Sequence, residues 1–132
     1  RCCAIDRAQR SRAIAMRATS GFLKLLVTDD DDMKILGMRA LGVHASTTIA
    51  EVSLVMRHNR SVRDIAELLH PHPSVTEGVQ DCVRMLLGSS IYKPQVFKNA
   101  LRLSRVTYAE DGNAQEKTLR KDATKAGAPA TP

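Results

Sequence analysis

The sequence predicts an α+β fold, with an antiparallel β-sheet covered by helices on one face. The first half of the chain contains short apolar runs bounded by turn residues, which are typical of strands. The second half contains apolar residues at helical spacing. Strands followed by a run of helices are characteristic of an α+β domain. A chain of 132 residues is long enough for one such domain with a modest core.

Three segments in the first third of the chain are predicted to be strands. Ser11–Arg17 alternates weakly, whereas Phe22–Thr28 and Met33–Gly42 are richer in apolar residues. Between the last two stand four consecutive aspartates, residues 29–32. This run lacks the alternating ligands, the glycine and the glutamate of an EF-hand loop, and aspartate is common in turns. We therefore expect a solvated hairpin tip and not a calcium site.

Three helices are expected to follow the strands. The first covers about residues 45–56, with Ser46 as its N-cap. The second is short, is capped by Ser61, and ends before Pro71 because proline cannot continue a helix. The third runs from about Val75 to Leu87 and carries a continuous apolar stripe.

The two ends of the chain are expected to lie outside the folded domain. Residues 1–10 have no clear periodicity and are predicted to be an irregular N-terminal segment. Residues 109–132 are almost free of large apolar side chains and are predicted to be a disordered C-terminal tail. The domain is therefore expected to span residues 11–108.

Charge and hydropathy argue against two classes of partner. The net charge is +6, but most of the excess comes from the arginines of residues 1–17, and the remaining charges are mixed in sign. This distribution does not favour a nucleic-acid-binding surface. No apolar run approaches the roughly 20 residues that a membrane span needs. We expect neither a nucleic-acid partner nor a membrane partner.

The three cysteines do not form a disulfide framework. Cys2 and Cys3 are adjacent, which disfavours a bond between them, and they lie in the segment expected to be irregular. Cys82 falls on the apolar stripe of the third helix and is expected to be a small buried apolar residue. Free cysteines favour a reducing compartment, either the cytoplasm or an organellar matrix.

The segment His70–Glu77 concentrates the chemistry-bearing side chains of the chain. It contains two histidines, two prolines and one glutamate, directly before the third helix. The prolines fix the backbone, so that His72 stands on a stiff connector. Ser74 and Glu77 also match a capping box, in which the glutamate would only cap the helix. The histidines could equally be polar residues of an interhelical loop.

Two further interpretations of this segment remain open from the residues alone. His70, His72 and Cys82 could supply metal ligands, but their spacing matches no common zinc pattern, and we expect no metal. The second and third helices have the order of a winged helix-turn-helix, a DNA-binding domain in which the hairpin would be the wing. The start of the third helix, however, carries a carboxylate and no basic residue.

A family resemblance separates these interpretations. His72-Pro73-Ser74-x-x-Glu77 resembles the His-Pro-(Thr/Ser)-x-x-Glu signature of the pyridine nucleotide-disulfide oxidoreductases. With His70 included, it is most similar to the dihydrolipoyl dehydrogenase and mercuric reductase-like branch. Upstream segments resemble the hairpin of the family's C-terminal dimerisation domain, and the resemblance covers about residues 11–88. These segments are Gly21-Phe22-Leu23-Lys24-Leu25, Lys34-Ile35-Leu36-Gly37 and Leu41-Gly42.

The resemblance implies a half-site in a homodimer. Residues 11–108 would be the dimerisation domain of an FAD-dependent NAD(P)H:disulfide oxidoreductase that acts in cell redox homeostasis. His72 would be the acid/base that exchanges a proton with a thiol of the partner subunit. Glu77 would orient the imidazole, and the backbone of His72 and Pro73 would approach the partner's FAD. His70 is assigned no catalytic role.

The sequence also departs from the complete family pattern. It contains no Gly-x-Gly-x-x-Gly and no pair of cysteines spaced as in a redox-active disulfide. The chain is therefore expected to be the carboxyl-terminal third of a flavoenzyme, which alone binds neither FAD nor NAD(P) and is inactive. The strand that usually opens the dimerisation domain is expected to be missing before Ser11. Bare apolar faces should cause the isolated chain to dimerise or aggregate.

Overall fold

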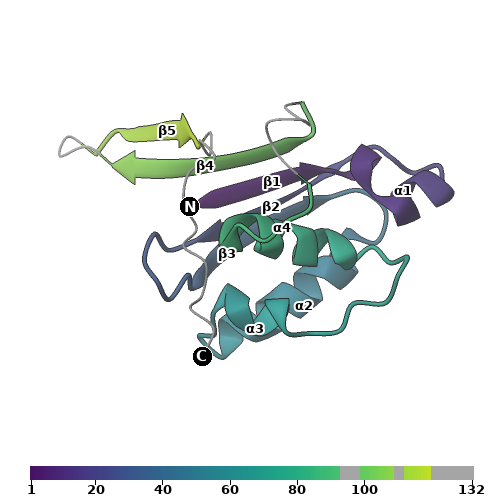
Figure 1. Ribbon diagram of the computed structural model, residues 1–132, viewed down its shortest axis with the longest axis horizontal. Coiled ribbons are helices and arrows are strands. Elements are labelled where there is room, and N and C mark those ends of the chain that lie inside the picture. The colour runs from purple at the N-terminus through teal and green to yellow at the C-terminus, as the bar shows by residue number, and fades with distance from the viewer. Residues whose placement is uncertain (93–98, 109–111, 120–132) are drawn as a thin grey trace, which may run out of the picture.

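A computed structural model describes residues 1–92, 99–108 and 112–119. Five antiparallel strands form one sheet in the order β3-β2-β1-β4-β5. Helices α2, α3 and α4 lie on one face of this sheet (Figure 1). The predicted α+β class with helices on one face is confirmed. The strands are β1 (Cys2–Asp6), β2 (Phe22–Val27), β3 (Ile35–Leu41), β4 (Leu101–Tyr108) and β5 (Ala114–Thr118), and the helices are the 3-10 turn η1 (Arg7–Gln9), α1 (Ser11–Ala15), α2 (Ala45–Arg57), α3 (Val62–Ala66) and α4 (Glu77–Leu87).

The expectation of an irregular segment at residues 1–10 is wrong. Cys2–Asp6 forms β1, the central strand, which pairs with β2 on one side and β4 on the other. Cys3 and Ile5 are buried on the side of the helices, so that cysteine acts here as a small apolar residue. A strand therefore does precede Ser11. Five residues are too few for the alternation to stand out in the sequence.

The predicted strand at Ser11–Arg17 is also wrong. Ser11–Ala15 forms the short helix α1, in which the amide of Ile14 donates to the carbonyl of Arg10 at 2.9 Å. Only Ala13 is buried, and Ile14 is 56% exposed. The apparent alternation therefore did not mark a buried face of a sheet.

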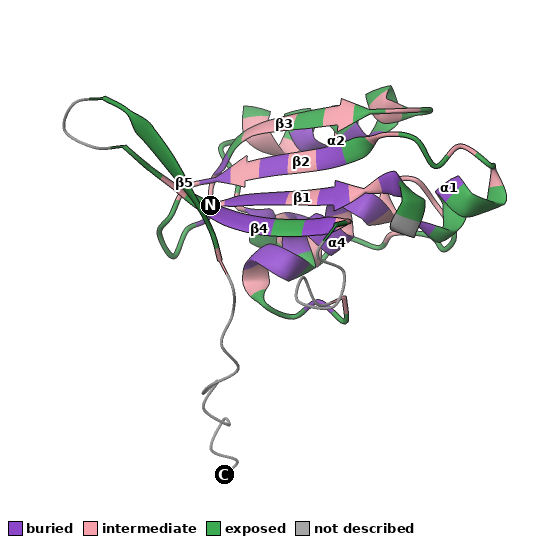
Figure 2. Ribbon diagram, turned by 90° about the horizontal axis from the view of Figure 1, so that it is seen from above, coloured by how far each residue is buried: buried purple, intermediate pink, exposed green. Residues whose placement is uncertain are grey.

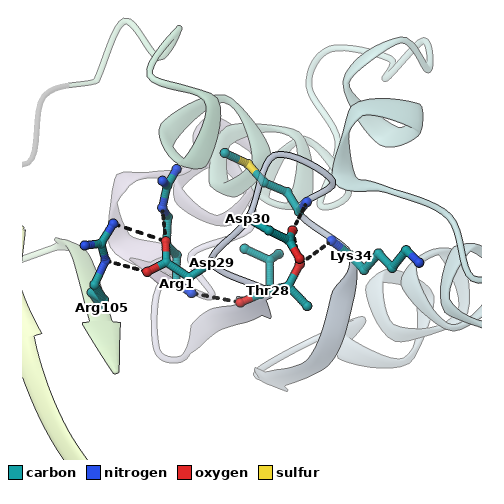
Figure 3. A network of polar contacts seen from close by, with 8 residues as sticks. Arg1, Thr28, Asp29, Asp30, Lys34 and Arg105 are labelled. Atoms are coloured by element: carbon teal, nitrogen blue, oxygen red, sulfur yellow. Dashed lines mark hydrogen bonds and ion pairs between the residues drawn. The ribbon is translucent and has the colours of Figure 1, made fainter. Parts of the chain in front are cut away.

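The aspartate run forms the connection between β2 and β3, as expected of a hairpin tip. Asp30 stabilises this turn by accepting from the Thr28 hydroxyl at 2.6 Å and from the Met33 amide at 2.9 Å. Asp29 accepts from Arg1 at 2.7 Å and from Arg105 of β4 at 2.6 Å (Figure 3). The turn is thereby tied to the strand on the far side of β1.

The three predicted helices are present, with small differences at their starts. The N-cap of α2 is His44, in the left-handed conformation at φ 59°, and not Ser46, which lies in the first turn. Ser61 caps α3 in a capping box with Asp64, as predicted. The last helix, α4, begins at Glu77, two residues later than expected.

The core lies between the sheet and helices α2–α4. It is aliphatic, and Cys82 of α4 is buried within it as expected. Buried residues run along β1, β2 and β4, whereas β5 is exposed throughout (Figure 2). Among the described residues, no helix is long and apolar enough to cross a membrane.

Part of the predicted disordered tail is ordered. Residues 114–118 form β5, which pairs with β4 along its whole length. Polar side chains on both faces hide this strand from periodicity arguments, because an edge strand needs no buried face. Residues 109–111 and 120–132 lie outside the described part of the chain, so the expectation for them stays a prediction.

Candidate functional site

The connector between α3 and α4 carries the predicted site. It follows α3, passes through Pro71 and Pro73, and ends at the first turn of α4. His72 stands on this connector with its side chain 68% exposed. The two prolines restrict the backbone on either side of His72. The local sequence therefore presents one imidazole to solvent from a stiff support.

Glu77 contacts His72 and, at the same time, exchanges hydrogen bonds with Ser74 in the turn before α4. One carboxylate oxygen, Oε1, lies 2.6 Å from Nδ1 of His72. The other, Oε2, accepts from the backbone amide of Ser74 at 2.6 Å, and the Ser74 hydroxyl accepts from the Glu77 amide at 3.3 Å. The Ser74 bonds of the capping-box pattern and the imidazole contact are therefore not alternatives. The bond from the Ser74 amide fixes the carboxylate that faces the histidine.

The surroundings of Glu77 favour its ionised form. Partial burial opposes ionisation, but the Ser74 amide, the His72 imidazole and the positive charge of Arg10 together outweigh burial and lower the Glu77 pKa below its ordinary value. The carboxylate is therefore charged at neutral pH. It can stabilise a positive charge on His72.

The other ring nitrogen of His72 is available for proton transfer. A carboxylate at Nδ1 requires the ring proton at that position, which leaves a lone pair on Nε2 in the neutral imidazole. Nε2 makes no hydrogen bond or ion pair within the part of the chain that the structure describes. The pair can therefore take up a proton at Nε2 and return it.

Arg10 supports the first turns of α4 from the sheet side. It is buried, forms an ion pair with Asp81, and stacks on Tyr92 with its guanidinium carbon 4.5 Å from the ring centroid. Asp81 follows Glu77 by one helical turn. Sequence reasoning missed Arg10 because residues 1–10 were expected to be irregular, and no local pattern pairs it with Asp81.

His70 does not join His72. Its Nε2 lies 2.7 Å from Oε1 of Glu51 in α2, and its side chain is 3% exposed. Cys82 is buried in the core, apart from the exposed His72. In residues 1–92, 99–108 and 112–119, no three His, Cys, Asp or Glu side chains form a cluster that could hold a metal ion.

Comparison with known proteins identifies the family. Residues 2–83 match the family described as pyridine nucleotide-disulphide oxidoreductase, dimerisation domain. The chain is 36% identical over 85 residues to the dihydrolipoyl dehydrogenase of Geobacillus stearothermophilus, covering 64% of this chain and 18% of that protein. The dihydrolipoyl dehydrogenase of Bacillus subtilis is 32% identical over 85 residues, which again cover 64% of this chain and 18% of that protein.

Two solved structures have the same fold. LpdA from Mycobacterium tuberculosis superposes with a TM-score of 0.61 at 20% identity, over 65% of this chain and 18% of that one. The HOCl-induced flavoprotein disulfide reductase RclA from Escherichia coli, solved as a cysteine-to-serine mutant in complex with Cu(II), superposes with a TM-score of 0.61 at 27% identity, over 65% of this chain and 19% of that one.

The match is confined to one region of these larger proteins, because the chain spans only about a fifth of the length of the relatives. A winged helix-turn-helix is not supported. The first two turns of α4 contain no basic residue, because Glu77 contacts His72 there and Asp81 is buried against Arg10, and the β2–β3 hairpin belongs to the central sheet. The extent of the family match over β1 to α4 shows that the chain belongs to the pyridine nucleotide-disulfide oxidoreductase family, as a dimerisation domain.

Proposed function

We propose that this chain supplies an acid/base pair to the redox-active disulfide of a partner subunit, within an FAD-dependent NAD(P)H:disulfide oxidoreductase similar to dihydrolipoyl dehydrogenase. One observation carries the proposal. His72 is bound at Nδ1 by an ionised Glu77, while Nε2 has no partner among the residues that the structure describes and the side chain is 68% exposed. The chain belongs to a family of dimerisation domains, which supports the assignment of the thiols to another subunit.

The chemistry follows from the acidities of thiol and imidazole. Thiol–disulfide exchange requires a thiolate, and a free thiol with a pKa of about 8.5 is mostly protonated at neutral pH. An imidazole has a pKa of about 6.5, which suits it to accept that proton and return it. His72 would take the thiol proton at Nε2, and Glu77 would stabilise the resulting imidazolium through Nδ1–H. When the thiol leaves, the same proton returns to sulfur.

The cysteines of this chain are unsuited to be the thiols. Cys2, Cys3 and Cys82 are free and buried. Burial raises the pKa of Cys2, and burial together with the neighbouring Cys82 raises that of Cys3. His72, in contrast, is exposed and lies outside the core. The thiols would therefore come from outside the chain.

The connector also fits an approach to the partner's FAD. The His72 carbonyl accepts no hydrogen bond from the described residues, and His72 and Pro73 are exposed. This backbone is free to contact a group from outside. When bound, the flavin would supply the electron pair that reduces the disulfide. FAD and NAD(P) would be held by other domains of the parent protein, because this chain contains no dinucleotide-binding motif.

The face of the sheet opposite helices α2–α4 fits a homodimer. Helices α2–α4 all lie on the other face (Figure 1). Phe22 and Leu41 pair across β2 and β3 and are 37% and 58% exposed. A twin subunit or a neighbouring domain would cover such apolar side chains. The parent enzyme would act in a reducing compartment.

The proposal is tested by His72→Gln in the protein that joins this chain to its FAD- and NAD(P)-binding domains. The rate of disulfide reduction should fall by about 10²- to 10⁴-fold, because general acid–base catalysis contributes that much. The flavin absorbance should not change. His58→Gln, which alters an exposed histidine at the end of α2, is the matched control. An unchanged rate in His72→Gln would contradict the catalytic assignment.

A further inference from the structure

We propose that His70 and Glu51 are positioning residues for His72: their ion pair latches the connector onto α2 and so fixes where the His72 imidazole projects. The effect of this positioning on catalysis rests on the proposed function, but the positioning itself can be tested on this chain alone. It gives a role to the one histidine of the motif that the proton transfer does not use.

The contact has the geometry of a strong, sheltered hydrogen bond. Nε2 of His70 lies 2.7 Å from Oε1 of Glu51, with the two side chains 3% and 18% exposed. Nδ1 of the same ring lies 3.1 Å from the backbone carbonyl oxygen of Leu68. Both ring nitrogens are thus engaged, in contrast to those of His72. An enclosed ring held at both ends cannot rotate without breaking a hydrogen bond.

The two partners of His70 dictate where protons sit. A carbonyl and a carboxylate are both acceptors, so both ring nitrogens must donate if Glu51 is ionised. His70 is then an imidazolium facing a carboxylate. Charge-assisted hydrogen bonds of this kind are shorter and stronger than neutral ones. Removing the carboxylate would leave the carbonyl of Leu68 as the one remaining acceptor of the two that hold the ring.

The carbonyl of Leu68 extends the latch to α4. It also accepts from the side-chain amide of Gln80 at 3.3 Å. The connector is therefore held to α2 through Glu51 and to α4 through Gln80. Only Pro71, with its fixed φ, separates His70 from His72. A displacement of His70 is consequently transmitted to His72 with little chance to be absorbed.

The first test measures the histidine rings of this chain by nitrogen-15 NMR at neutral pH. Two protonated ring nitrogens on His70 are expected, each with a slowly exchanging N–H. A ring with one unprotonated nitrogen facing Glu51 would overturn the proposal. This measurement needs no variant and does not depend on thiol chemistry.

The second test compares Glu51→Gln with Glu67→Gln. Glu67 is the exposed C-cap of α3 and makes no ion pair in the described residues, so its change removes the same charge nearby. In Glu51→Gln we expect the Nδ1–H signal of His72 to broaden and the His72 amide to exchange about tenfold faster. Amides of the central strand β1 should keep their protection from hydrogen exchange. A general loss of stability would lower that protection as well.

An unchanged His72 signal in folded Glu51→Gln would overturn the proposal, as would an equal change in Glu67→Gln. If Glu51→Gln does not fold, His70→Gln gives the same comparison, because it retains a side-chain donor but cannot reach both acceptors. In the parent enzyme, Glu51→Gln should lower kcat about tenfold with KM and flavin content unchanged. Loss of activity in His72→Gln but not in Glu51→Gln would refute the positioning role and leave the proposed function intact.

Discussion

Two histidine–glutamate pairs in the described part of the chain have nearly equal lengths but opposite environments. His70 and Glu51 are 2.7 Å apart and His72 and Glu77 are 2.6 Å apart, yet the imidazole is 3% exposed in the first pair and 68% in the second. Within the described part of the chain, the first ring has a partner at each nitrogen, and the second has one at Nδ1 alone. The same two side chains thus form a structural contact where both nitrogens are occupied and an acid/base where one is free.

Hydrogen bonds between Glu77 and Ser74 explain how the exposed pair keeps its geometry. Exposed ion pairs usually contribute little, because long side chains must be ordered in water. Glu77 is ordered already, since its second oxygen accepts from the Ser74 amide in the turn before α4. The Glu51 pair is ordered by enclosure instead. His72 is therefore both exposed and held in a fixed orientation, because its carboxylate partner lies at the start of a helix.

The largest expected effect separates the two roles of Glu77, which are to face His72 and to accept from the Ser74 amide. Glu77→Gln keeps an oxygen to accept from the Ser74 amide but removes the charge that faces His72. Disulfide reduction by the parent enzyme should fall about 100-fold, as expected for loss of a group that supports general acid–base catalysis. The free energy of unfolding in urea should change by less than about 0.5 kcal/mol. A variant that is equally active, or one that is greatly destabilised, would break the assignment of separate roles.

The second prediction concerns stability, for which the enclosed pair should matter more than the exposed pair. His70→Ala should lower the free energy of unfolding by about 2 kcal/mol, because it leaves the sheltered Glu51 carboxylate without its partner. His72→Ala should lower it by about 0.5 kcal/mol at most, since its ring is exposed. Urea denaturation of the two variants provides the measurement. Equal losses would show that enclosure does not distinguish the pairs.

The smallest effect concerns pH. The folded-state pKa of Glu77 is lowered, so its contribution to stability is fully present above the unfolded-state pKa and is lost as the pH falls through the folded-state value. Wild type should therefore lose up to about 0.5 kcal/mol more than Glu77→Gln on acidification through the carboxylate range. Urea midpoints measured at a series of acidic pH values test this difference. Parallel curves for the two proteins would count against an ionised, bonded Glu77.

The two pairs also differ in how far the sequence could predict them. His72 and Glu77 are five residues apart on one connector, so the motif and the capping pattern bring them together locally. Glu51 precedes His70 by 19 positions and meets it only when α2 packs beside the connector. Arg10 reaches Asp81 from the other end of the domain in the same way. Contacts of this kind follow from packing and not from any local pattern.

Prediction of the fold has the same limit. Helices α2, α3 and α4 were predictable because apolar residues at helical spacing mark each of them, and a capping box also marks the start of α3. The central strand β1 was not, because its five residues include two cysteines and a charged end. The edge strand β5 has no buried face to mark it. Strand pairing supplies their stability, and pairing partners are distant in the sequence.

The central claim is that His72 serves thiols of another subunit, and a mixed dimer tests it directly. One subunit of the parent enzyme would carry His72→Gln with its redox cysteines intact, and the other would keep His72 but have those cysteines replaced by serine. Each variant alone should be inactive. The mixed dimer should regain about half of the wild-type rate, because one of its two sites then combines an intact imidazole with intact thiols. A mixed dimer that stays inactive would contradict the account.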